Sequence, residues 1–252
     1  MLSSPADPAG AAGQDGLRLR PAAERFHSRS SWLDSRHSFS FAGHDDPLWR
    51  GFGPLRVINE DWIAAGQGFG PHPHRDIEII SVLLAGALSH RDSLGHSAVI
   101  QAGEVQCMSA GTGIVHSEIN AAEQPCRLLQ IWIEPRAAGL PPTYRQRAFP
   151  AREGWTPLID PDGRDAALAI ERPVRLWRGR AAAASQLPLP PLAGPLGWIQ
   201  LIEGRVSLEF KTGDHNSDPS LRAGDGLGFP AGAIRALDSG DDGTDLLLFE
   251  LG

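Results

Sequence analysis

Short apolar runs recur about every 8 to 15 residues, each ended by glycine, proline, asparagine or aspartate, and they most constrain what this chain can fold into. Glycine and proline make up 29 and 21 of the 252 residues, and few stretches carry the 3.6-residue period of an amphipathic helix. The pattern predicts an all-β protein built as a sandwich or small barrel. A hairpin turn is expected at 91–97, where Gly95 can adopt positive φ. The strands expected in the first half are 55–66, 77–92, 96–103, 105–111, 114–120 and 126–135.

One β-unit of the sequence is repeated. The segment "SVLLAGALSH…IQAGEVQCMSAG" has a counterpart in "IQLIEGRVSLEF…LRAGDGLGFPAG" in the second half. The last two of the three matched glycines are eight residues apart in both copies. The repeat predicts a first β-barrel at 18–148 and a second at 149–252, and the Ala/Gly/Pro-rich composition of residues 1–17 predicts a flexible tail. The matched glycines are Gly86, Gly103 and Gly111 in the first copy and Gly204, Gly224 and Gly232 in the second.

The charge balance argues against direct contact with nucleic acid. The formal net charge is −7, and no dense cluster of lysine and arginine is present to neutralise phosphates. An acidic surface is compatible with binding a regulatory protein. The start of the chain lacks the features of a secretory signal, and no apolar run approaches the ~20 residues that cross a bilayer. We therefore expect a cytoplasmic protein with no membrane contact, in which Cys107 and Cys126 are reduced thiols.

Histidines are concentrated in the first copy, and two of them lie in the segment "PHPHRDIEII" (71–80). Side chains on a strand alternate, so His72 and His74 point the same way, as do His116 and Glu118 of "GIVHSEIN". Three imidazoles and a carboxylate from two neighbouring strands would make a mixed site for a first-row divalent metal with open positions. The alternative is that each histidine is an ordinary turn or surface residue. By parity alone, Glu78 is as good a ligand as Glu118.

Other residues are assigned to non-catalytic roles. His90 and His96 flank the predicted hairpin turn and are expected at the surface, and Trp132 and Trp198 are expected to fill barrel cores. The glycines of "GQGFG" (66–70) are expected to bend the chain so that the histidine pair reaches the barrel mouth. This segment is not a phosphate loop, since no Lys-Ser/Thr or helix follows it. Residues 27–38 contain Ser, His and Asp but no nucleophile elbow, which argues against a hydrolytic triad. The only histidine of the second copy is His215, in an expected loop.

The spacing of the glycines, histidines and glutamates resembles the cupin superfamily and, within it, the pirin family of bicupins. The first cupin motif, G-x5-H-x-H-x(3,4)-E-x6-G, is matched from Gly66 to Gly86 with one extra residue. The second, G-x5-P-x-G-x2-H-x3-N, is matched from Gly103 to Asn120, with Ser109 in place of proline and four residues rather than two before the histidine. These departures are typical of pirins. Segments 32–42, 55–74, 90–95 and 108–118 are similar to bacterial pirins reported as quercetin 2,3-dioxygenases.

The resemblance covers residues 26–150 closely and the remainder more weakly. It implies two tandem cupin barrels of jelly-roll type, a first that binds metal and a second that lacks the ligands. The pirin pattern takes His72, His74, His116 and Glu118 as ligands. It places Glu78 next to the ligands but not among them, where it either orients an imidazole or forms an ion pair with Arg75 or Arg91. Fe(II) is the metal expected first, and Mn, Co, Ni, Cu or Zn also suit such a ligand set.

The activity that the resemblance implies is ring opening of a flavonol such as quercetin by O2 with release of CO. In such an enzyme the metal would lower the pKa of the flavonol hydroxyl, and Glu118 would take its proton. The alternative is a regulatory pirin that binds a transcription factor or a metabolic enzyme, with the metal as a redox sensor or a structural element. A purely structural metal is less favoured, because such sites normally close their coordination sphere.

Overall fold

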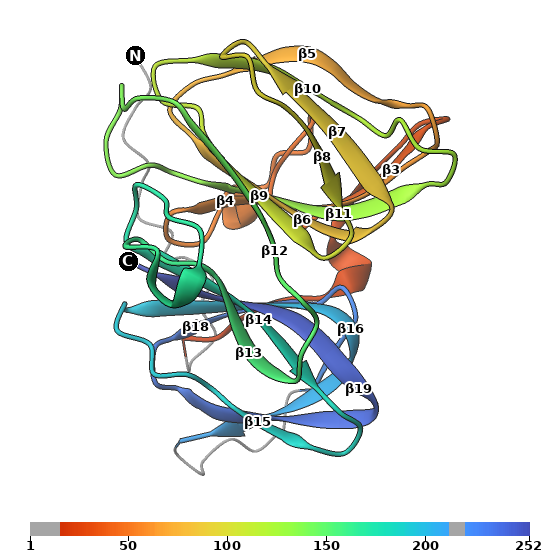
Figure 1. Ribbon diagram of the computed structural model, residues 1–252. Helices are drawn as coiled ribbons and strands as arrows, with labels where there is room; N and C mark the ends of the chain where they lie inside the picture. The colour runs from red at the N-terminus through yellow and green to blue at the C-terminus, as the bar shows by residue number, and fades with distance from the viewer. Residues whose placement is uncertain (1–15, 212–219) are drawn as a thin grey trace.

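The computed structural model describes residues 16–211 and 220–252, and Figure 1 shows that the regular structure is almost entirely β-strand. The strands form two units, one above the other in Figure 1, as the all-β prediction required. Single turns of 3-10 helix occur at η2 (Ala22–Glu24), η3 (Pro47–Trp49) and η4 (Arg164–Ala166). No helix in the described ranges is long and apolar enough to cross a membrane. His215 and residues 1–15 of the expected tail lie outside the described residues.

The first unit consists of two sheets that face each other. A four-stranded sheet has the order β5-β10-β7-β8, and a seven-stranded sheet has the order β12-β9-β6-β11-β4-β3-β2. Neither is a closed barrel, and the unit is a jelly-roll-like cupin fold. The strands are β2 (Phe26–Arg29), β3 (Leu33–His37), β4 (Leu55–Ile63), β5 (Gly68–His74), β6 (Glu78–Ala85), β7 (Ala87–Asp92), β8 (Ser97–Gln101), β9 (Glu104–Ser109), β10 (Ile114–Ile119), β11 (Cys126–Ile133) and β12 (Thr143–Ala148).

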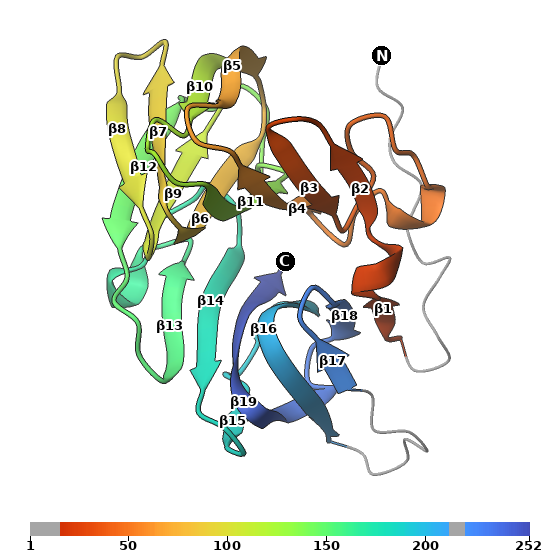
Figure 2. The same ribbon diagram turned by 90° about the vertical axis from the view of Figure 1, so that its right-hand side faces the viewer.

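The second unit is an eight-stranded sheet that includes a strand from the start of the chain. The order is β1-β18-β16-β19-β14-β13, with β15 paired to β19 and β17 to β16. Residues 18–20, expected in the first unit, form β1 and pair with β18 in the second (Figure 2). A segment of three residues is too short for its sequence pattern to indicate which strand it will pair with. The strands are β1 (Arg18–Arg20), β13 (Gly154–Ile159), β14 (Val174–Ala181), β15 (Gln186–Pro188), β16 (Leu196–Phe210), β17 (Ser220–Arg222), β18 (Gly226–Pro230) and β19 (Ile234–Leu251).

The sequence repeat is a repeat of backbone conformation. The Gly103 amide donates to the Leu83 carbonyl at 3.0 Å, and in the second copy Gly224 donates to Leu201 at 2.9 Å. All six matched glycines have positive φ, where a side chain would be strained. Their φ angles are 73° (Gly86), 86° (Gly103), 44° (Gly111), 83° (Gly204), 89° (Gly224) and 84° (Gly232).

The strand that carries the histidine pair begins within the glycine segment (66–70) that was expected to bend the chain. Residues 68–74 form β5, which pairs with β10 alone among the described strands and is therefore an edge strand. An edge tolerates Pro71 and Pro73, because the missing amide hydrogens need no partner on the outer side. The run expected as one strand at 77–92 is two, β6 and β7, separated at Gly86. The hairpin at 91–97 is confirmed, with Gly95 at φ 93°.

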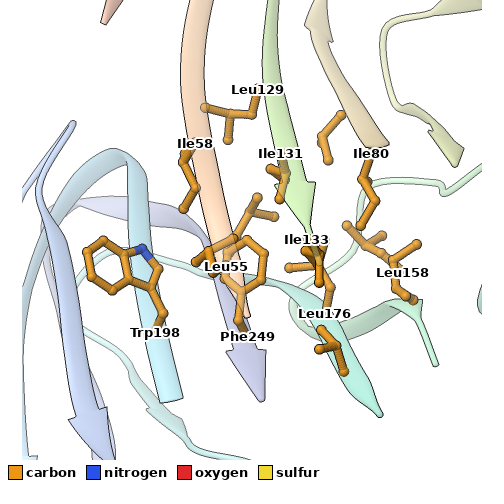
Figure 3. Close-up of a cluster of buried hydrophobic side chains, with 14 of the residues drawn as sticks. Leu55, Ile58, Ile80, Leu129, Ile131, Ile133, Leu158, Leu176, Trp198 and Phe249 are labelled. Carbon is orange, nitrogen blue, oxygen red and sulfur yellow. The ribbon is translucent and has the colours of Figure 1, made fainter. Parts of the chain in front are cut away.

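A shared apolar core joins the two units (Figure 3). Trp198 of β16 is fully buried and packs against Phe39 and Phe52 of the first unit, with ring centroids 5.0 and 5.5 Å apart. Trp198 is therefore a core residue, but it fills the core between the two units rather than the interior of a barrel. On β6, Ile80 and Val82 belong to this core. Because side chains alternate, the residues between them face the interior of the first unit.

Candidate metal centre

Strand β10 lies between β5 and β7, so its inward-facing side chains meet residues from both neighbours. On one side, His116 pairs with His72 and Ile114 pairs with His74. On the other side, His116 pairs with Asp92. Directly opposite residues on neighbouring strands have their side chains on the same face and in contact range. The register therefore brings His72, His74 and His116 together, as the sequence predicted.

The three imidazoles converge on one point. His72 Nε2 and His116 Nε2 are 3.0 Å apart, and one ring nitrogen from each of the three histidines lies within 4.8 Å of the others. His74 Nε2 is buried and has no hydrogen-bond partner among the described residues. Two nitrogens at about 2.1 Å from one ion and at right angles to each other would be about 3.0 Å apart. The separation and the unpartnered nitrogen fit a shared divalent cation.

The protonation of these rings also suits a metal. His72 Nδ1 lies 2.8 Å from the Gly70 carbonyl, which can only accept, so Nδ1 carries a hydrogen. In a neutral His72 ring, Nε2 then presents its lone pair. Burial, reinforced by the neighbouring imidazoles, lowers the pKa of His74 to about 4 and that of His116 to about 3. Both rings are therefore neutral at pH 7, which is the form that binds metals.

Glu118 is buried next to His116 and is held by hydrogen bonds from the facing sheet. Gln130 Nε2 donates to its two carboxylate oxygens at 3.0 and 3.3 Å, and Ser81 Oγ donates at 3.4 Å. The Trp132 indole N–H donates to Gln130 Oε1 at 3.3 Å, which turns the amide NH2 towards the carboxylate. Glu118 thus groups with His116 and His90 within 4.8 Å, whereas His72 and His74 group with His116.

Gln130 was missed in the sequence, and Trp132 was assigned only to the core. The signal was available in "LLQIWI", where a single glutamine interrupts an otherwise apolar strand. Gln130 pairs with Ser81 in the register of β11 and β6, so both reach the interior of the first unit. Trp132 is only half-buried, and its ring meets that of His74 edge-on at 4.9 Å between centroids.

Glu78 does not take either of its two expected roles. It is fully buried at the start of β6, on the face that carries Ile80 and Val82. Its Oε1 accepts a hydrogen bond from Ser109 at 2.9 Å, and Oε2 has no partner among the described residues. The parity counted from His74 fails because residues 75–77 form a turn, with Asp76 at φ 51°. The alternation therefore restarts at β6.

Replacement of Glu78 by glutamine should stabilise the protein in alkaline solution. Burial raises the pKa of Glu78 from 4.5 to about 7, although the Ser109 hydrogen bond opposes this. The folded state thus favours the protonated carboxyl, and wild-type stability falls as pH rises from the unfolded pKa through the folded one. Between about pH 5 and pH 8, the free energy of unfolding of Glu78→Gln should gain roughly 2 to 3 kcal/mol on that of wild type, measured by urea denaturation. A pH-independent difference would contradict this assignment.

His90 was expected at the surface, and this was wrong. Its side chain is fully buried, with Nε2 3.1 Å from Asp92 Oδ2 and its ring against that of Tyr144 at 4.7 Å. The turn starts only after Asp92, so His90 is still in strand β7 and alternates into the interior. His96 lies beyond the turn, and its side chain is 41% exposed.

The second unit contains no comparable cluster in its described residues. In residues 154–211 and 220–252, no three His, Cys, Asp or Glu side chains bring ligand atoms within 4.8 Å of one another. The two cysteines, Cys107 and Cys126, are both buried and carry free thiols.

Comparison with known proteins agrees with the fold. The family model "Pirin" matches residues 18–133, and the model "Quercetinase C-terminal cupin domain" matches residues 158–251. A quercetin 2,3-dioxygenase of Escherichia coli is 45% identical over 193 residues, which is 76% of this chain and 84% of the relative. The crystal structure of the E. coli pirin YhhW in complex with nickel(II) is 41% identical, with a TM-score of 0.85 over 93% of this chain and 98% of that one. The E. coli protein YhaK is 27% identical, with a TM-score of 0.71 over 84% and 92%. The chain belongs to the pirin family.

Proposed function

We propose that this pirin is a metal-dependent dioxygenase that opens the ring of a flavonol such as quercetin with O2. The observation that carries the proposal is the convergence of three imidazoles beside a buried carboxylate, in a chain 45% identical to a quercetin 2,3-dioxygenase. The ligands that we assign are His72, His74, His116 and Glu118. Fe(II) is our first choice of metal, and the nickel(II) complex of YhhW makes nickel the second to test.

The chemistry divides between the ion and the chain. A bound divalent ion would lower the pKa of a coordinated hydroxyl and hold a substrate through adjacent hydroxyl and carbonyl oxygens. Glu118 would accept the hydroxyl proton, since its carboxylate lies in the same cluster as His116. Gln130 would keep Glu118 turned towards the substrate, because two of the carboxylate contacts come from its amide.

Aromatic side chains beside the site support a planar substrate. Trp132 lies edge-on to His74, and Phe41 packs against Trp132 with ring centroids 5.3 Å apart. Both are half-buried, so they are able to contact a ligand as well as each other. Aromatic pairs favour such edge-to-face and offset geometries, and a flat polyphenol can extend them.

The test is direct turnover. Protein stripped with a chelator and reloaded separately with Fe, Mn, Co, Ni, Cu or Zn is incubated with quercetin under air, and flavonol absorbance and O2 uptake are followed together. One O2 should be consumed for each flavonol lost, with the stripped protein as control. An absence of turnover with every metal would contradict the dioxygenase and favour a regulatory protein whose partner is another protein.

A further inference from the structure

Strand β7 places a second chain of hydrogen-bonding groups directly behind His116. The register of β7 and β10 sets Asp92 opposite His116 and His90 opposite Glu118, and all four side chains are buried. His90 Nδ1 lies 3.5 Å from His116 Nδ1, and His90 Nε2 lies 3.1 Å from Asp92 Oδ2. A carboxylate and two imidazoles thus form a line, and its end is the His116 nitrogen that faces His72.

We propose that Asp92 and His90 are positioning residues that hold His116 in the tautomer needed to bind a divalent cation. This inference rests on the proposed metal site and adds two residues that do not themselves bind the metal. Histidines that ligate metals nearly always donate their other N–H to a carboxylate, a carbonyl or water. Here the neutral His90 imidazole accepts the N–H of His116, and the Asp92 carboxylate acts on His116 through His90.

The direction of each hydrogen bond follows from what each group can donate. An ionised Asp92 only accepts, so His90 Nε2 must carry the hydrogen. In neutral His90, Nδ1 is then an acceptor, and His116 Nδ1 has to donate to it. His116 Nε2 is left with a free lone pair, aimed at the point that His72 and His74 share. The 3.5 Å separation is at the long end of the hydrogen-bond range.

We call the hydrogen-bonded chain Asp92–His90–His116 the relay. The surroundings of His90 hold the relay in one arrangement. The Tyr144 ring packs on His90 at 4.7 Å between centroids. Asp92 Oδ1 accepts the backbone amides of Leu94 and His96 at 2.9 and 3.0 Å. The hairpin turn thus holds one carboxylate oxygen, and the other, Oδ2, faces the rings of His90 and His96 at 3.1 and 2.9 Å. A carboxylate held in this way has only one orientation relative to the imidazole.

Asp92→Asn tests the relay because the hairpin turn determines how the amide must sit. The two backbone amides keep an oxygen at the Oδ1 position, so the NH2 group takes the place of Oδ2. It would then donate to His90 Nε2, and His90 would have to carry its hydrogen on Nδ1. His116 Nδ1 would become an acceptor, and its own hydrogen would move to Nε2. We expect Co(II) affinity, measured by competition with a chromophoric chelator, to fall about 10- to 100-fold.

Three further variants separate the effect of these hydrogen bonds from a general loss of packing. His90→Asn keeps an oxygen where Nδ1 was and should retain more Co(II) affinity than His90→Leu, which should lose about 10- to 100-fold. His96→Ala removes the other ring that contacts Asp92 Oδ2 at 2.9 Å, and it should leave Co(II) affinity unchanged. Circular dichroism should show the same fold in all four variants.

The imidazole ¹⁵N spectrum gives a second readout. His90 should be protonated on Nε2 in zinc-loaded wild type and on Nδ1 in Asp92→Asn stripped of metal, since zinc on His116 Nε2 would keep the His116 hydrogen on Nδ1. Unchanged Co(II) affinity in both Asp92→Asn and His90→Leu, or wild-type His90 protonated on Nδ1, would overturn the relay. These measurements need no flavonol, so a wild type that binds Co(II) without turning over quercetin overturns only the proposed function. A wild type that binds no Co(II) overturns the metal site and the relay together.

Discussion

Replacement of His74 or Glu118 by alanine should each remove most of the bound metal while the fold persists. His74 contributes a buried nitrogen with no partner among the described residues, and Glu118 contributes the only carboxylate in the cluster with His116. Loss of a residue that only supports a ligand typically costs 10- to 100-fold in metal affinity, so loss of a ligand should cost more than about 100-fold. Elemental analysis of the purified variants measures the metal, and circular dichroism measures the fold.

The matched control for both variants is His215→Ala. It removes the single histidine of the second sequence copy and should leave metal content unchanged. Metal retained in full by either His74→Ala or Glu118→Ala would remove that residue from the site. Metal lost in His215→Ala would mean that the second copy contributes to binding.

Truncation of Trp198 should be among the most destabilising single changes in the protein. The indole is fully buried between the two units and contacts Phe39 and Phe52. Truncation of a buried tryptophan to alanine typically costs about 3 to 5 kcal/mol, because the lost contacts leave a cavity that only partly collapses. Trp198→Ala should therefore lower the free energy of unfolding by about that amount in urea denaturation.

A surface tryptophan provides the comparison. Trp62 is 37% exposed, and its ring stacks with the Arg127 guanidinium at 5.3 Å. Trp62→Ala should cost about 1 kcal/mol, less than Trp198→Ala, since part of the ring stays in water and its truncation leaves no enclosed cavity. Equal losses in the two variants would show that the shared core between the units does not contribute the stability assigned to it.

The shared orientation within each pair of proposed ligands was predictable, because each pair lies within one strand. His72 and His74 share β5, His116 and Glu118 share β10, and alternation within a strand is a local property. The prediction for Glu78 failed at the first turn, because Asp76 interrupts the alternation. His90 was placed at the surface for a related reason, since proximity to a turn was given more weight than its position in β7.

The sequence by itself determined the all-β class, the repeat and which residues of a single strand share a face. Period-two alternation and the glycine turns are local, and the six matched glycines all adopt positive φ. Only the tertiary structure decided what meets across strands and sheets. The register of β10 with β5 and β7 gathers the histidines, Gln130 reaches Glu118 from the facing sheet, and β1 crosses to the second unit. Such contacts depend on which strands pair and in which register. Pairing between segments far apart in the chain produces no periodic pattern that can be read from a single sequence.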